Sequence, residues 1–405
     1  MKVCLLGPTY PFRGGVAHYT TALCHHLRER HEVVFISYRR QYPAFLFPGR
    51  SQTASGPTPL AVESEPLFDS LNPVSWRRIV SRIRGEQPDL VVFNWVTPFL
   101  AVPFWYIARG ARRASDARIV MICHNVKQHE GFPAERWLTR KSLGAAHCLI
   151  VHSEGDAQNA KALVSGADIV KALLPTYGFL SAGSTSAQQA RQHFRLPPGP
   201  ILLFFGFVRE YKGLRYLLEA MPAVRREVPE VHLLVVGEFW DDKRPYLELI
   251  DQLGIGDAVT VIDAYVPDDD VQRYFAAADL VVLPYVSATQ SAIVQLAFGA
   301  GKPVVTTNVG GLPDVVTNNE TGFLVEPRDP QALADAIAKA LGDGTLVRLA
   351  SNVRGAADRF SWERLVDTLQ ACAKPSRVGR AHLQSPPPSN GAREASGTAR
   401  TGGGH

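Results

Sequence analysis

The chain has 405 residues, of which 46% are hydrophobic and 20% are charged, and this balance excludes an intrinsically disordered protein. At this length we expect two domains of roughly 170–190 residues each. The five cysteines are scattered and include no Cys-x-x-Cys pair, so we expect reduced thiols in a cytoplasmic protein. Because Met1–Leu6 continues directly into a strand, we expect no signal peptide.

Charge is distributed unevenly between the two halves. Residues 1–180 carry 21 Lys and Arg against 13 Asp and Glu, a net of +8, whereas residues 181–374 carry 18 against 24, a net of −6. A basic first half favours an anionic partner, either a phosphate-bearing acceptor or the inner face of the cell membrane, where the protein would bind peripherally. We do not expect nucleic acid as a partner, because the basic residues are not interleaved with aromatic residues in a reader motif.

In the first half, short apolar runs alternate with amphipathic helical segments, a pattern typical of parallel α/β sheets. The predicted strands are Val3–Leu6, Val33–Ser37, Leu90–Phe93, Ile119–Cys123, Cys148–Val151 and Ile169–Leu174. The uncharged stretch 90–108 contains Pro98 and Pro103, so it is predicted to be a buried strand followed by a helix and not a membrane span. The proline-rich segment Gln41–Pro66 is interpreted as a long functional loop.

The second half repeats this alternation after a linker predicted at residues 181–200, which is rich in Ser, Gln and Pro. Its predicted strands are Ile201–Phe205, His232–Val236, Val259–Ile262, Leu280–Leu283, Val304–Thr306 and Gly322–Val325. Helices at Pro330–Leu341 and Trp362–Ala373 are expected to close the fold. The tail 375–405 is predicted to be disordered.

The predicted fold is therefore α/β, with two Rossmann-like, doubly wound parallel-sheet domains facing a central cleft. The first domain would span residues 1–180 and the second residues 201–352, with the helices of 353–374 closing the fold. Because such sheets bind ligands at the carboxyl ends of their strands, we expect an interdomain cleft for a two-part substrate.

Two glycines, Gly14 and Gly15, follow the first predicted strand and open a helix. Paired glycines let backbone N–H groups approach a phosphate at a helix N-terminus, although a simple strand-to-helix turn also needs glycine. The sequence Gly-x-Gly-x-x-Gly is absent, and the second strand ends without an acidic residue for a ribose hydroxyl. NAD is therefore not expected.

A second glycine turn follows the first strand of the second half and contains Gly206, Arg209, Lys212 and Gly213. When a nucleotide-sugar bond breaks, the leaving diphosphate gains negative charge, which two fixed cations stabilise. The alternative is a solvated turn with extended Arg and Lys side chains.

Together with the runs Gly301–Val305 and Gly310–Asp314, these motifs resemble the retaining GT-B glycosyltransferases of family 4, from Met1 to about Ala373. The resemblance implies a UDP- or GDP-linked sugar donor, no metal cofactor, and a lipid-linked acceptor for cell-envelope polysaccharide. It places the donor mainly on the second domain and the acceptor on the first. Arg209 and Lys212 would contact the donor diphosphate, and Gly14 and Gly15 would form the phosphate-facing loop.

Further residues are predicted for the site, and among them the resemblance itself points to one. It implies a catalytic role for His124, which follows a strand and is expected to face the cleft, although a lone histidine is more often structural. The other predicted donor-binding residues are Glu238, Thr289, Gln290, Ser291 and Gln295. Weaker candidates on the acceptor side are His18, Tyr19, His129 and Glu130.

The sequence departs from the family at two positions. The family usually carries two glutamates there for donor hydroxyls, whereas this chain has Ala288 and Leu296. A non-catalytic GT-B binding protein therefore stays open as an alternative. A second alternative is a nucleotide-sugar epimerase of the same fold. The run Asp268–Asp270 resembles a metal-binding carboxylate motif, but after Pro267 it is expected to open a helix, and no metal site is predicted.

Overall fold

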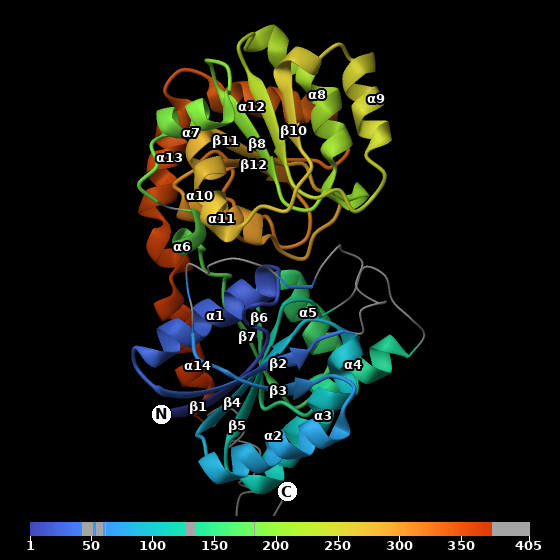
Figure 1. The fold of residues 1–405 in the computed structure, drawn as a ribbon, viewed down its shortest axis with the longest axis vertical. Coiled ribbons are helices and arrows are strands. Elements are labelled where there is room, and N and C mark those ends of the chain that lie inside the picture. The colour runs from blue at the N-terminus through green and yellow to red at the C-terminus, as the bar shows by residue number, and fades with distance from the viewer. Residues whose placement is uncertain (43–51, 54–59, 61, 127–133, 182, 375–405) are drawn as a thin grey trace, which may run out of the picture.

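The computed structural model describes residues 1–42, 52–53, 60, 62–126, 134–181 and 183–374, and it consists of two α/β domains stacked one above the other (Figure 1). The first sheet has the strand order β3-β2-β1-β4-β5-β6-β7 and the second the order β10-β9-β8-β11-β12-β13. All strand pairs are parallel. The chain direction across each sheet reverses beside its first strand, β1 or β8, as in doubly wound folds. The predicted fold class is confirmed.

The strands of the first sheet are β1 (Lys2–Leu6), β2 (Glu32–Arg40), β3 (Glu65–Asp69), β4 (Leu90–Trp95), β5 (Arg118–Cys123), β6 (Cys148–Val151) and β7 (Asp168–Lys171). Those of the second are β8 (Ile201–Phe205), β9 (His232–Val236), β10 (Val259–Ile262), β11 (Leu280–Leu283), β12 (Val304–Thr307) and β13 (Gly322–Val325). Strand β3 was not predicted, because it begins within the proline-rich segment Gln41–Pro66, which was interpreted as a loop. A proline is tolerated there because β3 is an edge strand.

The helices of the first domain are α1 (Gly15–Arg28), α2 (Pro73–Glu86), α3 (Ala101–Ala114), α4 (Glu135–Leu143) and α5 (Glu154–Leu163). Those of the second are α8 (Leu214–Glu227), α9 (Arg244–Gln252), α10 (Asp268–Ala277), α11 (Ala292–Gly299), α12 (Pro330–Leu341) and α13 (Thr345–Gly355). Both faces of the first sheet are covered. Along β1, Val3 and Leu5 enter one hydrophobic core and Cys4 and Leu6 another. In the described ranges, no helix combines the length and apolar composition that crossing a bilayer requires.

Two helices join the domains. Helix α6 (Gly178–Ser181) leads into the predicted linker, which contains a further helix, α7 (Ala187–Phe194). That helix begins with a capping box between Ser186 and Gln189, and Phe194 at its end stacks on Tyr274 of α10 with ring centroids 4.3 Å apart. The linker is thus partly folded onto the second domain.

The last described helix, α14 (Trp362–Cys372), returns to the first domain and packs beside α1 (Figure 1). The Arg118 Nε of β5 donates to the Cys372 carbonyl at 3.2 Å, and the side chains of Gln370 and His31 form a hydrogen bond of 2.9 Å. The first domain is therefore completed by the C-terminal end of the described chain.

Candidate active site

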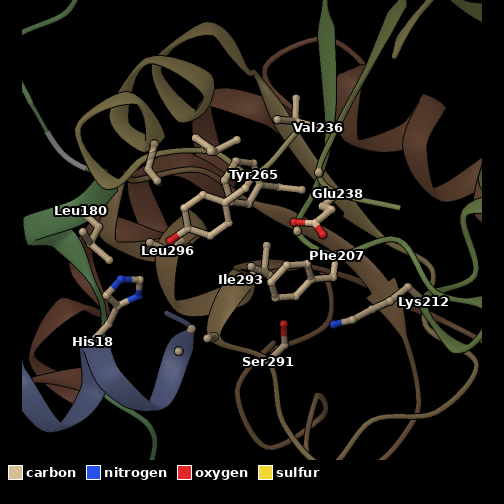
Figure 2. Close-up of a pocket in the computed structure, with 18 of the residues that line it drawn as sticks. His18, Leu180, Phe207, Lys212, Val236, Glu238, Tyr265, Ser291, Ile293 and Leu296 are labelled. Atoms are coloured by element: carbon tan, nitrogen blue, oxygen red, sulfur yellow. The ribbon is translucent and has the colours of Figure 1, made fainter. Parts of the chain in front are cut away.

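A cavity of about 340 Å³ lies between the two domains, and Figure 2 shows residues of the second domain and His18 of the first around it. It is lined by the loops after β8, β9 and β10 and by the first turns of α1, α10 and α11. The predicted site residues that line it are Gly14, Gly15, His18, Gly206, Arg209, Lys212, Glu238, Gln290 and Ser291. Motifs from both halves of the sequence thus meet at one site.

Two helix N-termini meet at this cavity. Gly14 precedes α1 with a φ of 102°, which L-residues rarely adopt. A Cβ atom on Gly15 would lie in ordinary van der Waals contact with the Cβ of Ala292, at 3.7 Å, so the starts of α1 and α11 lie close together. Ser291 precedes α11 without a side-chain cap. The backbone N–H groups of both first turns make this corner suitable for an anion.

The glycine turn of the second domain brings two cations to the cavity. Arg209 and Lys212 both line it, and Figure 2 shows the Lys212 side chain extending toward Ser291. The Lys212 Nζ lies 3.9 Å from the centroid of the Tyr285 ring, which supports the side chain through a cation–π contact. Gly213, with a φ of 71°, ends the turn where a Cβ would lie 1.9 Å from the Pro284 carbonyl oxygen.

Glu238 follows β9, is buried, and lines the same cavity. Next to it, Gly237 allows the backbone to pass Gly206, because a Cβ there would lie 1.9 Å from the Gly206 carbonyl oxygen. The Arg13 guanidinium of the first domain lies 4.0 Å from the centroid of the ring of Tyr265, which lines the cavity. Sequence reasoning did not identify Arg13.

His124 does not line the cavity but lies in a buried cluster of the first domain. Its Nε2 is 3.2 Å from Asn94 Oδ1, and its ring centroid is 4.6 Å from that of the fully buried Tyr19 and 5.7 Å from that of His152. Burial and the neighbouring His152 hold the pKa of His124 well below its ordinary value, so its imidazole is neutral. Gln290 Nε2 donates to the His124 carbonyl at 3.0 Å, which links this cluster to the cavity wall.

The segment before α11 contacts both domains. The Thr289 hydroxyl donates to Asn125 Oδ1 of the first domain, while the Gln295 side chain is fully buried in α11; neither residue lines the cavity. Leu296 does line it, whereas Ala288 lies outside it; these are the two positions at which the sequence resemblance led us to expect glutamate. His129, Glu130 and most of the predicted loop 41–66 fall outside the described residues.

The acidic run at the start of α10 contributes one residue to the cavity, Asp268. Its carboxylate contacts His18 Nε2 across the cleft at 3.0 Å. Burial, with a contribution from Asp269, raises the pKa of Asp268 to about 6, and burial lowers the pKa of His18 to about 4. The sequence suggested a helix start at this run, which is confirmed, but it did not indicate a residue facing the cleft.

Comparisons with known proteins define the class. The profile described as "Glycosyltransferase Family 4" matches residues 13–169, and that of "Glycosyl transferases group 1" matches residues 199–343. The chain is 30% identical over 303 residues to the D-inositol 3-phosphate glycosyltransferase of Corynebacterium urealyticum, covering 69% of this chain and 66% of the relative. It is 31% identical over 253 residues to the enzyme of that name from Segniliparus rotundus, covering 61% and 54%. The matches thus span about half to two thirds of these relatives.

Solved structures share the fold. Sucrose-phosphate synthase from Thermosynechococcus elongatus superposes with a TM-score of 0.67 at 21% identity, covering 92% of this chain and 98% of that one. Anabaena HepE in complex with UDP and glucose gives 0.69 at 19% identity, covering 92% and 100%. The architecture is therefore GT-B. The chain belongs to the group 1 glycosyltransferases of family 4.

Proposed function

We propose that the protein transfers a sugar from a UDP- or GDP-linked donor to an acceptor, with retention of configuration and without a metal. The observation that carries the proposal is the meeting of Arg209 and Lys212 with the starts of α1 and α11 at one cavity. A departing diphosphate would be stabilised there by two cations and by backbone N–H groups. The base would lie near Glu238 and residues 261–265, and closure of the cleft would exclude water as a competing acceptor.

The experiment is a panel of UDP- and GDP-sugars screened for thermal stabilisation, followed by transfer assays with the donors that bind. A transferase forms the glycosylated product only when the acceptor is present, and nuclear magnetic resonance of that product reports whether the anomeric configuration is retained. If the protein binds neither UDP nor GDP in calorimetry, the proposal is overturned, and a non-catalytic protein is the conclusion. Conversion of the donor with no acceptor present would identify an epimerase instead.

For the acceptor, we propose a lipid-linked precursor of a cell-envelope polysaccharide, met at the cytoplasmic face of the membrane. The support is a basic groove on α3 and α4, which we call the α3–α4 surface; its lining side chains include Trp105, Arg109, Arg112, Arg113, Trp137, Arg140 and Lys141. The Trp137 side chain is 61% exposed, and none of the described residues lining the groove is acidic. Cations beside exposed aromatic residues suit an anionic bilayer.

Vesicle flotation tests this surface. The double substitution Arg109→Glu with Arg113→Glu should lower binding to vesicles containing phosphatidylglycerol by about thirtyfold or more, since each basic residue contributes about 1 kcal/mol and the introduced glutamates are repelled. The matched control makes the same charge change, Arg215→Glu with Arg226→Glu, on α8 of the second domain. Equal binding by both variants would remove the α3–α4 surface from the proposal. The names of the relatives favour a second candidate acceptor, a soluble phosphorylated polyol, and transfer to inositol 3-phosphate in solution would support it.

A further inference from the structure

One carboxylate of the second domain is held by two side chains of the first. Asp268 begins α10, and its Oδ1 and Oδ2 lie 3.0 and 3.1 Å from His18 Nε2. The Tyr10 hydroxyl, from the loop after β1, donates to Oδ2 of the same carboxylate. The Tyr10 and His18 rings lie side by side with centroids 5.8 Å apart. The first domain therefore presents two donors to a single acidic group across the cleft.

Holding Asp268 in this position costs free energy. Its side chain is only 7% exposed. In the described part of the chain its ion-pair partner is His18, and this imidazole is neutral at pH 7 because its pKa is lowered to about 4. The neighbouring Asp269 adds electrostatic repulsion, which the start of α10 offsets in part. A buried carboxylate without a cationic partner is expensive, and such groups occur preferentially at binding sites.

The same carboxylate has hydrogen-bonding capacity left for a ligand. An ionised carboxylate offers about four lone-pair sites, of which Tyr10 and His18 use two. Asp268 lines the cavity near Tyr265 and Val266, and Glu238 and Asp268 are the carboxylates among the described residues that line it. Figure 2 shows His18, the partner of Asp268, on the opposite side of the cavity from Lys212. The Asp268 end thus suits an uncharged part of a ligand that bears hydroxyl groups.

We propose that Asp268 binds the ribose hydroxyls of the nucleotide-sugar donor, and that Tyr10 and His18 position its carboxylate from the opposite domain. This inference rests on the proposed function, because it takes a nucleotide as the ligand. The order of a nucleotide sugar supports the assignment. The ribose joins the base to the diphosphate, and its 2′ and 3′ hydroxyls lie on the edge of the ring away from the 5′ diphosphate; with the diphosphate at Lys212 and the base near Tyr265, that edge would face Asp268. A carboxylate repels the diphosphate itself, whereas it accepts hydrogen bonds from two adjacent hydroxyls.

The test is calorimetry with UDP and GDP, and with the 2′-deoxy and 3′-deoxy forms of whichever nucleotide binds. Asp268→Asn should weaken binding of the intact nucleotide on the order of tenfold, because hydrogen bonds to charged groups contribute about 1.5–3 kcal/mol. Removing a ribose hydroxyl should weaken binding to the native protein by a similar factor. In Asp268→Asn the same removal should weaken binding by less than about threefold, because the hydrogen bond between the carboxylate and the hydroxyl is already lost. The matched control is Asp269→Asn, the exposed neighbour with the same charge change.

Tyr10→Phe and His18→Gln test the positioning role. Each should reduce the discrimination between the nucleotide and its deoxy form, a readout that a merely structural contact would not change. If Asp268→Asn does not fold, Tyr10→Phe decides, and undiminished discrimination in that variant overturns the inference. The inference is also overturned if the losses of affinity from Asp268→Asn and from removal of the ribose hydroxyl are additive. The proposed function is not affected by that result. If the native protein binds neither UDP nor GDP, the proposed function fails and this inference fails with it.

Discussion

Both domains present a glycine of positive φ to the cleft after their first strand: Gly14 at 102° in the first domain and Gly206 at 104° in the second. The two loops differ in the charged side chains next to these glycines. The second loop delivers Arg209 and Lys212 to the cavity, whereas the first presents the start of α1 and directs Arg13 onto the ring of Tyr265. Similar backbone geometry thus makes room for a ligand at both domains. The positions of the charged side chains decide which domain holds the anionic part of that ligand.

The largest expected effect tests this difference at Lys212. Lys212→Ala should lower turnover on the order of 10²-fold, because it removes one group that stabilises the departing diphosphate. Steady-state kinetics with the identified donor measures it. The control is Arg215→Ala on α8, whose side chain is 70% exposed and does not line the cavity. Near-normal turnover in Lys212→Ala would show that the second domain does not hold the diphosphate through this turn.

The backbone of the same turn can be tested separately from its charge. Gly213→Ala would force a Cβ to within 1.9 Å of the Pro284 carbonyl oxygen at a φ of 71°. We expect a loss of about 2–3 kcal/mol in the free energy of unfolding, seen as a drop in Tm of several degrees. Gly254→Ala is the matched control, because its φ is 62° but open space surrounds it, so it should lose only about 1 kcal/mol. Equal losses would mean that the close approach to Pro284 is not limiting.

Acidification should affect the first domain more than the second. Burial lowers the pKa of five first-domain histidines, His18, His31, His124, His147 and His152. In the second domain the same effect is found at His232. These groups stay neutral in the native state while the unfolded chain takes up protons below pH 6.5, so stability is lost as pH falls from 6.5 toward 4. A buried histidine with a pKa of about 4, such as His152, should lower the free energy of unfolding by about 1 kcal/mol when the pH falls from 7 to 5.5.

Hydrogen exchange resolved by domain at these two pH values is the measurement. Amides of the first domain should lose more protection than those of the second. His152→Gln should reduce the pH dependence, whereas His25→Gln should leave it unchanged because its side chain is 48% exposed. Equal loss of protection in the two domains would contradict the prediction.

The smallest expected effect concerns the attachment of α14 to the first domain. Arg30 Nη1 and Asp367 Oδ1 lie 2.7 Å apart, but their side chains are 42% and 60% exposed. Arg30→Ala should therefore cost less than about 1 kcal/mol, because exposed ion pairs contribute little. Thermal unfolding at low and high salt checks this. A salt-sensitive loss of several degrees would show that the surface pair, and not the packing of α14, joins this helix to the first domain.

Much of the fold was predictable from local patterns. Strands such as β9 (His232–Val236) and β13 (Gly322–Val325) have the predicted bounds, because buried parallel strands are continuous apolar runs. Helix α7 was missed although Ser186 and Gln189 form a capping box, which is a local pattern that the composition of the linker obscured. Strand β3 was missed because it begins within the proline-rich segment Gln41–Pro66, and only its place at the sheet edge makes Pro66 acceptable.

By itself the sequence determined the two α/β domains, the glycine turns, and the delivery of Arg209 and Lys212 to the carboxyl end of a sheet, because strand periodicity and topology place residues that follow a strand at that edge. Only the tertiary structure decided that Asp268 faces His18 and Tyr10, and that Arg13 lies on Tyr265. An acidic helix start has the same local pattern whether it faces solvent or another domain. Contacts between residues 250 positions apart depend on how the domains are placed, which no local periodicity encodes.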